Sequence, residues 1–311
     1  MNPNYQLNNN EKMISNNRFT LPLVSICIPT YNGEKYIEEA LNSALRQTYK
    51  NIEIVISDDN SCDSTLDVVN QIQKNTKIPI FIYNHQQNGL GSNWNNCVRK
   101  ASGEYIKLLF QDDIIFPNCI EKMMQIALKD KKIGLVFSKR NFLYIDENNY
   151  VDEMNKYYKE LHIFWENLKS INSGTKLLKE CSCLRDVPQN KVGEPTVVLL
   201  KKEVFTKVGF FNETLVQILD YEFWYRVFKY YKIGFINEEL ASFRLHEMQA
   251  SQINNRTYLN EYLLYDKFLY ENLFFQLSPN NQKELFKKFN KFYNLLRRIK
   301  RKFKISFEYR S

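Results

Sequence analysis

Two adjacent carboxylates, Asp112 and Asp113, are the sharpest candidates for chemistry in this 311-residue sequence. They follow the apolar run 105–110 after one residue, Gln111, at the point where a buried strand would end. Carboxylate oxygens bind hard divalent cations, and such a cation neutralises a departing diphosphate. The same two residues would also suit a turn, or the cap of a helix that starts near Pro117. The pair alone leaves both interpretations open.

A second acidic pair, Asp58 and Asp59, follows the apolar run 52–56. A carboxylate here can accept a hydrogen bond from a nucleotide base, and Tyr31, which follows another apolar run, can stack on one. Turn chemistry is the alternative, because Asp, Asn and Ser together favour loops and helix caps.

Asp220 and Glu222 precede an aromatic segment that includes Trp224, and His246 is one of three histidines in the chain. A carboxylate held against apolar walls has a raised pKa and suits a general base. In the first turn of a helix it would also stabilise the helix dipole, which is the simpler interpretation. A neutral histidine can complete a metal shell, although a lone one is more often an ordinary hydrogen-bonding residue.

Alternating strands and helices are expected to position these residues. Apolar runs at 23–28, 52–56, 80–83 and 105–110 predict buried strands, the first ended by Pro29, with amphipathic helices between them. This alternation indicates βαβ units and an α/β fold with a mostly parallel, Rossmann-like central sheet and flanking helices. Ligands of such sheets bind beyond the carboxyl ends of the strands, so the polar loops PTYN, SDDNS, NHQQNG and QDD should share one rim.

Composition excludes several classes of protein. The chain is 44% apolar and 14% aromatic, which is ample for a large core and unlike a disordered protein. No run approaches the roughly 20 apolar residues of a membrane-spanning helix, and the polar N-terminus lacks the apolar centre of a signal peptide. The six cysteines are scattered without zinc-site spacing, so free thiols and a cytoplasmic location are expected.

Positive charge is concentrated at the C-terminus. Residues 280–311 hold eleven Lys and Arg against two acidic residues, a net charge of +9, which leaves −1 for the rest of the chain. A near-neutral body argues against nucleic acid as a partner. From Lys283 to about Lys304 apolar residues recur at helical spacing, which predicts one basic amphipathic helix. We expect it to lie on an anionic membrane surface; packing on the body and pairing with a second copy are the alternatives.

Six segments in this order resemble family 2 glycosyltransferases of GT-A fold, over residues 23–251. They read VSICIPTYNGEKYIEEALNSALRQTY, EIVISDDNSCDST, ASGEYIKLLFQDD, GEPTVVLLKKEVFTKVGFFNE, LDYEFWYR and FRLHEMQAS. The resemblance implies inverting, metal-dependent transfer of a hexose-type sugar from a nucleotide diphosphate donor, expected to be a UDP-sugar. The implied acceptor is a glycan or lipid-linked glycan in surface polysaccharide or glycoconjugate synthesis, at the inner face of the cytoplasmic membrane.

The resemblance also implies roles for individual residues. Asp220 matches the base carboxylate. The nucleotide would be held by Thr30, Tyr31, Asp59 and Asp112. Asp113 and His246 would bind Mn²⁺ or Mg²⁺. Contacts with the donor sugar or the acceptor are expected from Glu194, Glu222 and Trp224.

The sequence departs from the family pattern at three places, none of which removes the base or the metal ligand. Trp94–Asn95 stands where many relatives have Arg-Asn, Leu219 precedes Asp220 where Glu is common, and Asn212 replaces an Asp. A catalytically silent nucleotide-sugar binding module and a sugar nucleotidyltransferase are the competing functions. The second would need a Gly-rich basic phosphate loop, which Pro29–Gly33 is not.

Three parts of the chain are expected. Residues 1–20 would be a polar leader and residues 21–255 the glycosyltransferase domain. That domain would divide into a nucleotide-binding part, 21–138, and an acceptor part, 139–255. Residues 256–311 would form a helical, basic extension, and residues 139–190 show no regular pattern.

Overall fold

The computed structural model describes residues 21–144, 159–182, 184–246, 249 and 261–308, so the predicted leader lies outside the described residues. Its first half has the predicted alternation of strands and helices. In chain order the elements are β1 (Val24–Thr30), α1 (Ile37–Leu45), β2 (Ile52–Asp58), α2 (Thr65–Lys74), β3 (Ile80–Asn84), α3 (Leu90–Lys100) and β4 (Tyr105–Leu108).

The second half adds shorter helices and longer strands. Its elements up to the end of the sheet are β5 (Ile114–Ile115), α4 (Cys119–Ala127), β6 (Ile133–Tyr144), β7 (Ile171–Ser173), α6 (Gly174–Glu180), β8 (Val198–Lys201), α7 (Glu203–Val208), α8 (Leu219–Phe228) and β9 (Lys232–Leu245). Two 3₁₀ turns, η1 (Leu161–Phe164) and η2 (Pro195–Val197), precede β7 and β8. Part of the irregular stretch 139–190 is therefore regular, as the end of β6, β7 and α6.

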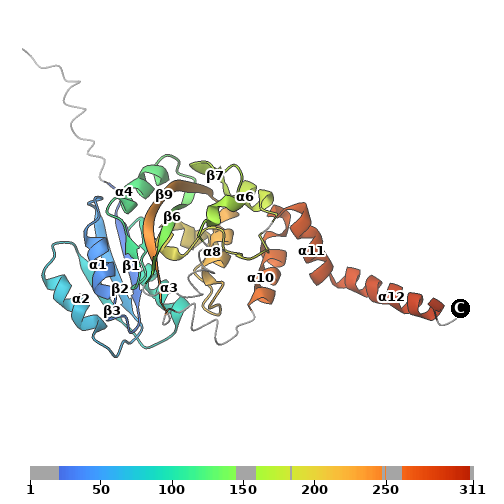
Figure 1. The fold of residues 1–311 in the computed structure, drawn as a ribbon, viewed down its shortest axis with the longest axis horizontal. Coiled ribbons are helices and arrows are strands. Elements are labelled where there is room, and N and C mark those ends of the chain that lie inside the picture. The colour runs from blue at the N-terminus through green and yellow to red at the C-terminus, as the bar shows by residue number, and fades with distance from the viewer. Residues whose placement is uncertain (1–20, 145–158, 183, 247–248, 250–260, 309–311) are drawn as a thin grey trace, which may run out of the picture.

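One mixed sheet organises the molecule, in the order β3-β2-β1-β4-β8-β6-β9-β5, with β7 on β9. The strands β3, β2, β1 and β4 are all parallel, as the crossovers through α1, α2 and α3 require. Antiparallel β8 joins this half to β6, and β6 pairs parallel with β9. In Figure 1, α1 and α2 lie on one side of the parallel strands and α3 on the other.

The prediction that the first strand ends at Pro29 is wrong, because β1 continues to Thr30. The amide of Leu109 donates to the carbonyl of Cys27. The backbone N–H and C=O groups of the odd-numbered residues of β1 therefore point toward β4. Pairing with β4 stops at Cys27, so the missing N–H of Pro29 has no strand opposite it. Pro29 therefore removes no hydrogen bond between strands. Because β1 continues past it, Thr30 lies at the rim of the sheet.

Five further helical segments follow the sheet: α10 (Tyr262–Phe268), a π-helical turn η3 (Leu269–Leu273), a 3₁₀ turn η4 (Phe274–Gln276), α11 (Pro279–Phe289) and α12 (Lys291–Glu308). The single helix predicted from Lys283 to Lys304 is thus two helices. Asn290 breaks it because its backbone is extended and its side chain accepts the amide of Tyr293, as a helix cap does. Figure 1 shows α11 against the body and α12 projecting from it.

No helix among the described residues is both long enough and apolar enough to cross a membrane. Cys27, Cys62, Cys97 and Cys119 are free thiols, three of them buried.

Candidate functional site

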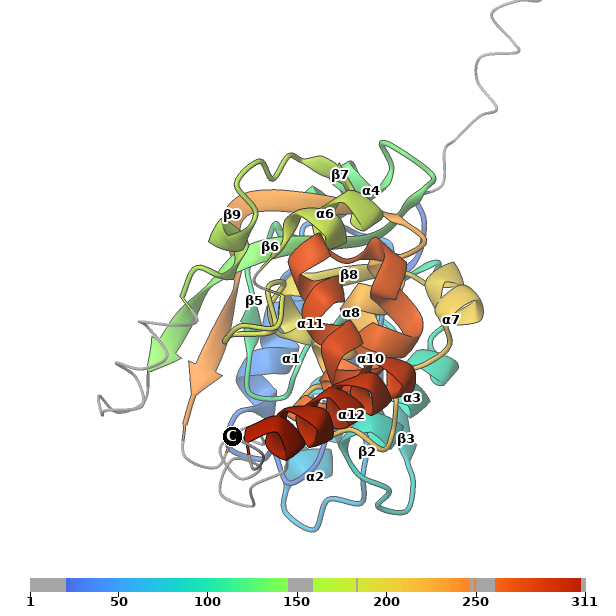
Figure 2. The same cartoon turned by 90° about the vertical axis from the view of Figure 1, so that its right-hand side faces the viewer.

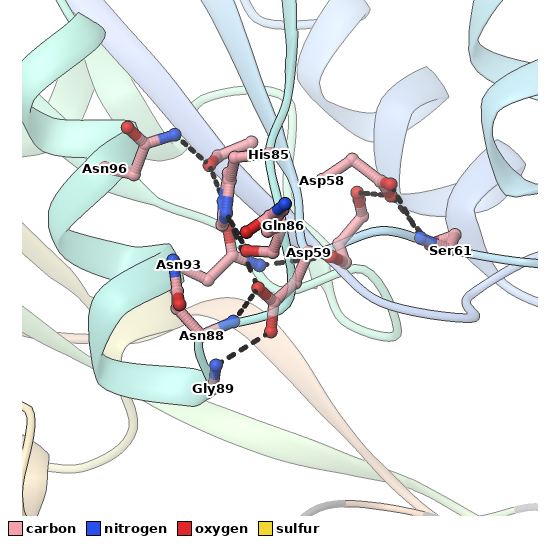
Figure 3. A network of polar contacts seen from close by, with 11 residues as sticks. Asp58, Asp59, Ser61, His85, Gln86, Asn88, Gly89, Asn93 and Asn96 are labelled. Atoms are coloured by element: carbon pink, nitrogen blue, oxygen red, sulfur yellow. Dashed lines mark hydrogen bonds and ion pairs between the residues drawn. The ribbon is translucent and has the colours of Figure 1, made fainter.

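Two acidic residues at the end of β2 organise one edge of the rim. Asp58 accepts hydrogen bonds from the hydroxyl of Thr30 (2.7 Å) and from the amide and hydroxyl of Ser61 (2.8 and 2.6 Å). Asp59 accepts the amides of Asn88 and Gly89, at 2.8 and 3.0 Å, which ties the start of α3 to β2 (Figure 3). Both carboxylates are buried and hold loops in place. The predicted nucleotide residues Thr30 and Asp59 therefore do lie together.

His85, at the end of β3, belongs to the same edge and was missed from the sequence (Figure 3). Its Nδ1 lies 3.5 Å from a carboxylate oxygen of Asp59. Its Nε2 lies 3.2 Å from both the hydroxyl of Ser57 and the amide oxygen of Asn93. A polar loop was expected after this strand, but nothing in NHQQNG indicates that its histidine turns inward toward Asp59.

Tyr31 and Gln111 join the ends of β1 and β4. The Tyr31 amide donates to Oε1 of Gln111 (2.9 Å), and Nε2 of Gln111 donates to the Tyr31 carbonyl (3.0 Å). A Cβ on Gly33 would meet the end of the Gln111 side chain, so a larger residue there would displace the amide that bonds to Tyr31. The Tyr31 ring is left 43% exposed and available for stacking.

Asp112 and His246 face each other across the rim, with Oδ2 and Nε2 3.0 Å apart. Both side chains keep some exposure, 20% for Asp112 and 13% for His246. The guanidinium of Arg244 donates to the carbonyl of Asp112 (2.8 Å) and lies over the Tyr36 ring, which also contacts His246. One carboxylate oxygen and one imidazole nitrogen thus meet at a surface that a ligand can reach.

Asp113 points the other way and is completely buried. Its two oxygens accept the hydroxyl of Thr196 (2.6 Å) and the amide of Arg244 (3.0 Å). Burial and the neighbouring charge of Asp112 raise its pKa well above the usual value. A fully buried carboxyl with both oxygens already hydrogen-bonded does not fit the metal-ligand role expected of Asp113. The partly exposed Asp112 fits that role better.

Asp220 is the second residue of α8 and keeps partial exposure. Its oxygens accept the amide of Tyr221 (2.7 Å) and the side-chain amide of Asn190 (2.8 Å). Burial raises its pKa to about 7, and the charge of Glu194 adds to the rise. Glu194 acts in the same direction on Asp113, so the three carboxyl groups share one region.

The three residues expected to contact sugar or acceptor do not lie together. Glu194 forms an ion pair with Arg140 (2.7 Å) beside Asp220. Glu222 is buried against Arg226 (2.9 Å), and burial raises its pKa. Trp224 has no exposed surface and its indole donates to the carbonyl of Gly193 (3.1 Å). The expectation for Trp224 is wrong: its ring lies in the core, where it packs on Phe211 and Phe223.

Two of the departures from the family pattern have packing roles. Trp94 packs on Phe110 and Phe211, with ring centroids 4.8 and 5.3 Å apart, and Asn95 exchanges hydrogen bonds with the backbone of Phe211. Together they fasten α3 to the segment that precedes α8. Asn212 caps its own loop through the amide of Thr214 (3.1 Å).

Comparison with protein families shows which family this chain belongs to. The model of glycosyl transferase family 2 matches residues 25–183, about half of the chain. This protein is a family 2 glycosyltransferase. Curated relatives of this glycosyltransferase include uncharacterised glycosyltransferases of Rickettsia conorii (33% identical over 252 residues, 80% of this chain and 38% of that protein) and Rickettsia typhi (33% over 237 residues, 74% and 66%). The chain thus spans well under half the length of the first.

Solved structures share the GT-A fold of this family 2 glycosyltransferase. Residues 1–349 of Staphylococcus aureus TarS superpose with a TM-score of 0.56 at 18% identity, over 86% of this chain and 72% of that one. The mannosyltransferase PcManGT of Pyrobaculum calidifontis, in complex with GDP-Man and Mn²⁺, gives a TM-score of 0.52 at 16% identity, over 83% and 63%. At these identities the likeness concerns the fold.

Proposed function

We propose that this glycosyltransferase transfers a sugar from a nucleoside diphosphate donor to a hydroxyl group of a glycan or lipid-linked glycan, with inversion at the anomeric carbon. The acceptor hydroxyl gives its proton to Asp220 as its oxygen bonds to the anomeric carbon. The bond from that carbon to the diphosphate breaks, and its electron pair leaves with the diphosphate. Attack from the face opposite the leaving group accounts for inversion.

The observation that carries the proposal is the state of Asp220. A pKa of about 7 makes this carboxyl a base that both accepts and releases a proton near neutral pH. Asn190 and the Tyr221 amide hold its oxygens in one orientation. A catalytically silent binding module has no need of such a group.

Asp112 and His246 fit a divalent cation, because Mn²⁺ and Mg²⁺ are commonly held by one or two protein ligands together with substrate phosphates. No group of three or more His, Cys, Asp or Glu suited to a metal occurs in the described part of the chain, which agrees with such an incomplete shell. The bound ion would neutralise the diphosphate as it leaves. The PcManGT complex contains Mn²⁺, which supports a divalent ion here.

The nucleotide is expected along the edge formed by Thr30, Tyr31 and Asp59, with the exposed Tyr31 ring against the base. TarS has been solved with UDP and with UDP-GlcNAc, so UDP-sugars are the first donors to test.

The test is a panel of UDP- and GDP-sugars assayed for hydrolysis with Mn²⁺, Mg²⁺ or EDTA. We expect turnover of at least one donor, its loss in EDTA and in Asp220→Asn, and normal turnover in the matched control Asp67→Asn, which alters an exposed acid on α2. Donor binding without turnover under every condition would instead favour a binding module.

We also propose that α12 lies on an anionic membrane surface, where lipid-linked acceptors are found. Phe292, Leu295, Leu296 and Ile299 are all more than 40% exposed, and Arg297 and Arg298 beside them are exposed too. Each cation near an anionic leaflet contributes roughly 1 kcal/mol. The helix α11, in contrast, packs on the body of the protein: Leu285 is fully buried and Lys288 forms an ion pair with Asp266 (2.7 Å).

Sedimentation with vesicles of anionic or neutral lipid tests this surface. The double variant Arg297→Glu/Arg298→Glu should lose most binding to anionic vesicles, whereas Lys74→Glu/Lys77→Glu, the same charge change on exposed lysines near α2, should keep it. Equal binding by both variants would mean that α12 does not contact the membrane.

A further inference from the structure

Glu261 sends its carboxylate away from its own helix, α10, to the loop that precedes α8. Oε1 accepts the amide of Val216 (2.9 Å), and Oε2 accepts the amides of Gln217 (2.9 Å) and Ile218 (3.1 Å). The residue is only 6% exposed. Three consecutive backbone N–H groups thus converge on one buried side chain that neither the sequence nor the family resemblance singles out.

These amides belong to the entrance of the helix that carries Asp220. Helix α8 begins at Leu219, and its N-cap, Ile218, has no side chain able to cap it. Amides at a helix entrance need acceptors, and a carboxylate is a favourable one. Glu261 therefore anchors the two residues before α8 and the amide of its N-cap, from 43 to 45 residues further along the chain.

The helix α10 also holds the start of the segment that leads to Asn190, the hydrogen-bond partner of Asp220. Asp266 forms a two-bond ion pair with Arg185 (2.7 Å each), and the hydroxyl of Tyr265 donates to the carbonyl of Leu184 (3.1 Å). The segment that starts there leads to Asn190, whose side-chain amide donates to Asp220. Figure 2 shows α10 and α11 in front of α8.

We propose that Glu261 is a positioning residue for the transfer reaction: by holding the three backbone amides that lead into α8, it fixes the entrance of that helix and with it the orientation of the Asp220 carboxylate toward the acceptor. The inference rests on the proposed role of Asp220. It makes the helical unit after the sheet a support for the active site.

The test compares Glu261→Ala, Glu261→Gln and the matched control Glu271→Ala, an exposed glutamate of the same unit that pairs with Lys267. The readouts are the NMR titration of the Asp220 carboxyl in the full chain, the kcat of metal-dependent UDP-sugar hydrolysis, and the Kd of UDP. In Glu261→Ala we expect the Asp220 midpoint to fall by at least one pH unit, because water enters the loosened turn, and kcat to fall about tenfold. The Kd of UDP should stay within about twofold, since the nucleotide edge lies on other elements.

Glu261→Gln keeps one acceptor oxygen, so it should show the same changes at about a third of the size, and Glu271→Ala should show none. If Glu261→Ala does not fold, the Asp220 titration and kcat of Glu261→Gln decide the test instead. A folded variant with the parent's Asp220 midpoint and kcat would overturn the proposal. Retained turnover in Asp220→Asn would overturn the base assignment instead, while the titration would still report whether Glu261 orients that carboxyl.

Discussion

The two ends of the sheet hold their carboxylates differently. At the nucleotide edge, Asp58, Asp59 and Asp63 accept backbone amides and hydroxyls from neighbouring loops. Although burial alone would raise the pKa of Asp63, hydrogen bonds from Thr65 and the Glu34 amide keep it below its usual value.

Across the sheet, Asp113 is fully buried and Asp220 partly buried, both near other acids, and the pKa of each is raised. The difference teaches that the first edge uses carboxylates as hydrogen-bond acceptors that build loops. The second edge holds Asp220, which gains and loses a proton near neutral pH, so proton transfer belongs there.

The strongest way to break this contrast is Asp220→Asn. Loss of the base should lower kcat by about 10²–10⁴-fold while the Kd of UDP changes only a few-fold, because the nucleotide edge is untouched. Steady-state kinetics with saturating donor, together with calorimetric UDP binding, measure both. A variant that kept half of its turnover would remove Asp220 from the mechanism.

Asp112 and Asp113 should respond in opposite ways. Asp112→Ala should weaken activation by Mn²⁺ about tenfold or more and leave the melting temperature nearly unchanged, since the side chain faces the rim. Asp113→Ala should cost roughly 2–4 kcal/mol of unfolding free energy, because two buried donors lose their acceptor. Metal titrations and urea unfolding of the two variants separate them. The reverse pattern would return the metal to Asp113.

Stability should depend on pH through Asp220, in the direction opposite to activity. Its pKa is about 7 in the folded protein and about 3.9 in an unfolded chain, so between these values the folded state binds more protons and stability falls as the pH rises. Asp220→Asn removes this loss. Its melting temperature should match the parent's near pH 4 and exceed it by a few degrees at pH 8. The parent's kcat should rise with pH through about 7, as the base loses its proton. Equal melting temperatures at both pH values would contradict the raised pKa.

Glu194→Gln should have the smallest effect on activity. It tests how far one neighbouring charge contributes to the raised pKa of Asp220. Removing this charge should lower the pKa of Asp220 and move the rising limb of the kcat profile to lower pH, by a few tenths to about one unit. Glu160→Gln, at an exposed partner of Lys139, serves as the control and should not shift the profile. A shift to higher pH would show that Glu194 acts on Asp220 through structure rather than charge.

Local patterns predicted the parallel half of the sheet, because strands and helices over 24–108 follow from spacing alone. They also brought Thr30, Asp59 and Asp112 to one rim, through the rule that loops gather at the carboxyl ends of strands. The role of Asp220 came from the family resemblance instead. Which of two adjacent aspartates faces inward depends on Thr196 and Arg244, distant residues that no local pattern connects to them. Likewise Trp224 looks equally apt for stacking or for a core until α8 is packed.

The anchor that Glu261 provides also bears on the order in which the protein acquires its structure. The strands β1, β2 and β3 pair with their neighbours in the chain, whereas the amides before α8 pair with a residue 43 to 45 positions further on, and Arg185 with one 81 positions further on. Contacts between residues far apart in the chain require the closure of longer loops. During synthesis, the nucleotide edge can assemble while α10 is still untranslated, and the contacts between Glu261 and the entrance of α8 can form only after residue 261 has left the ribosome.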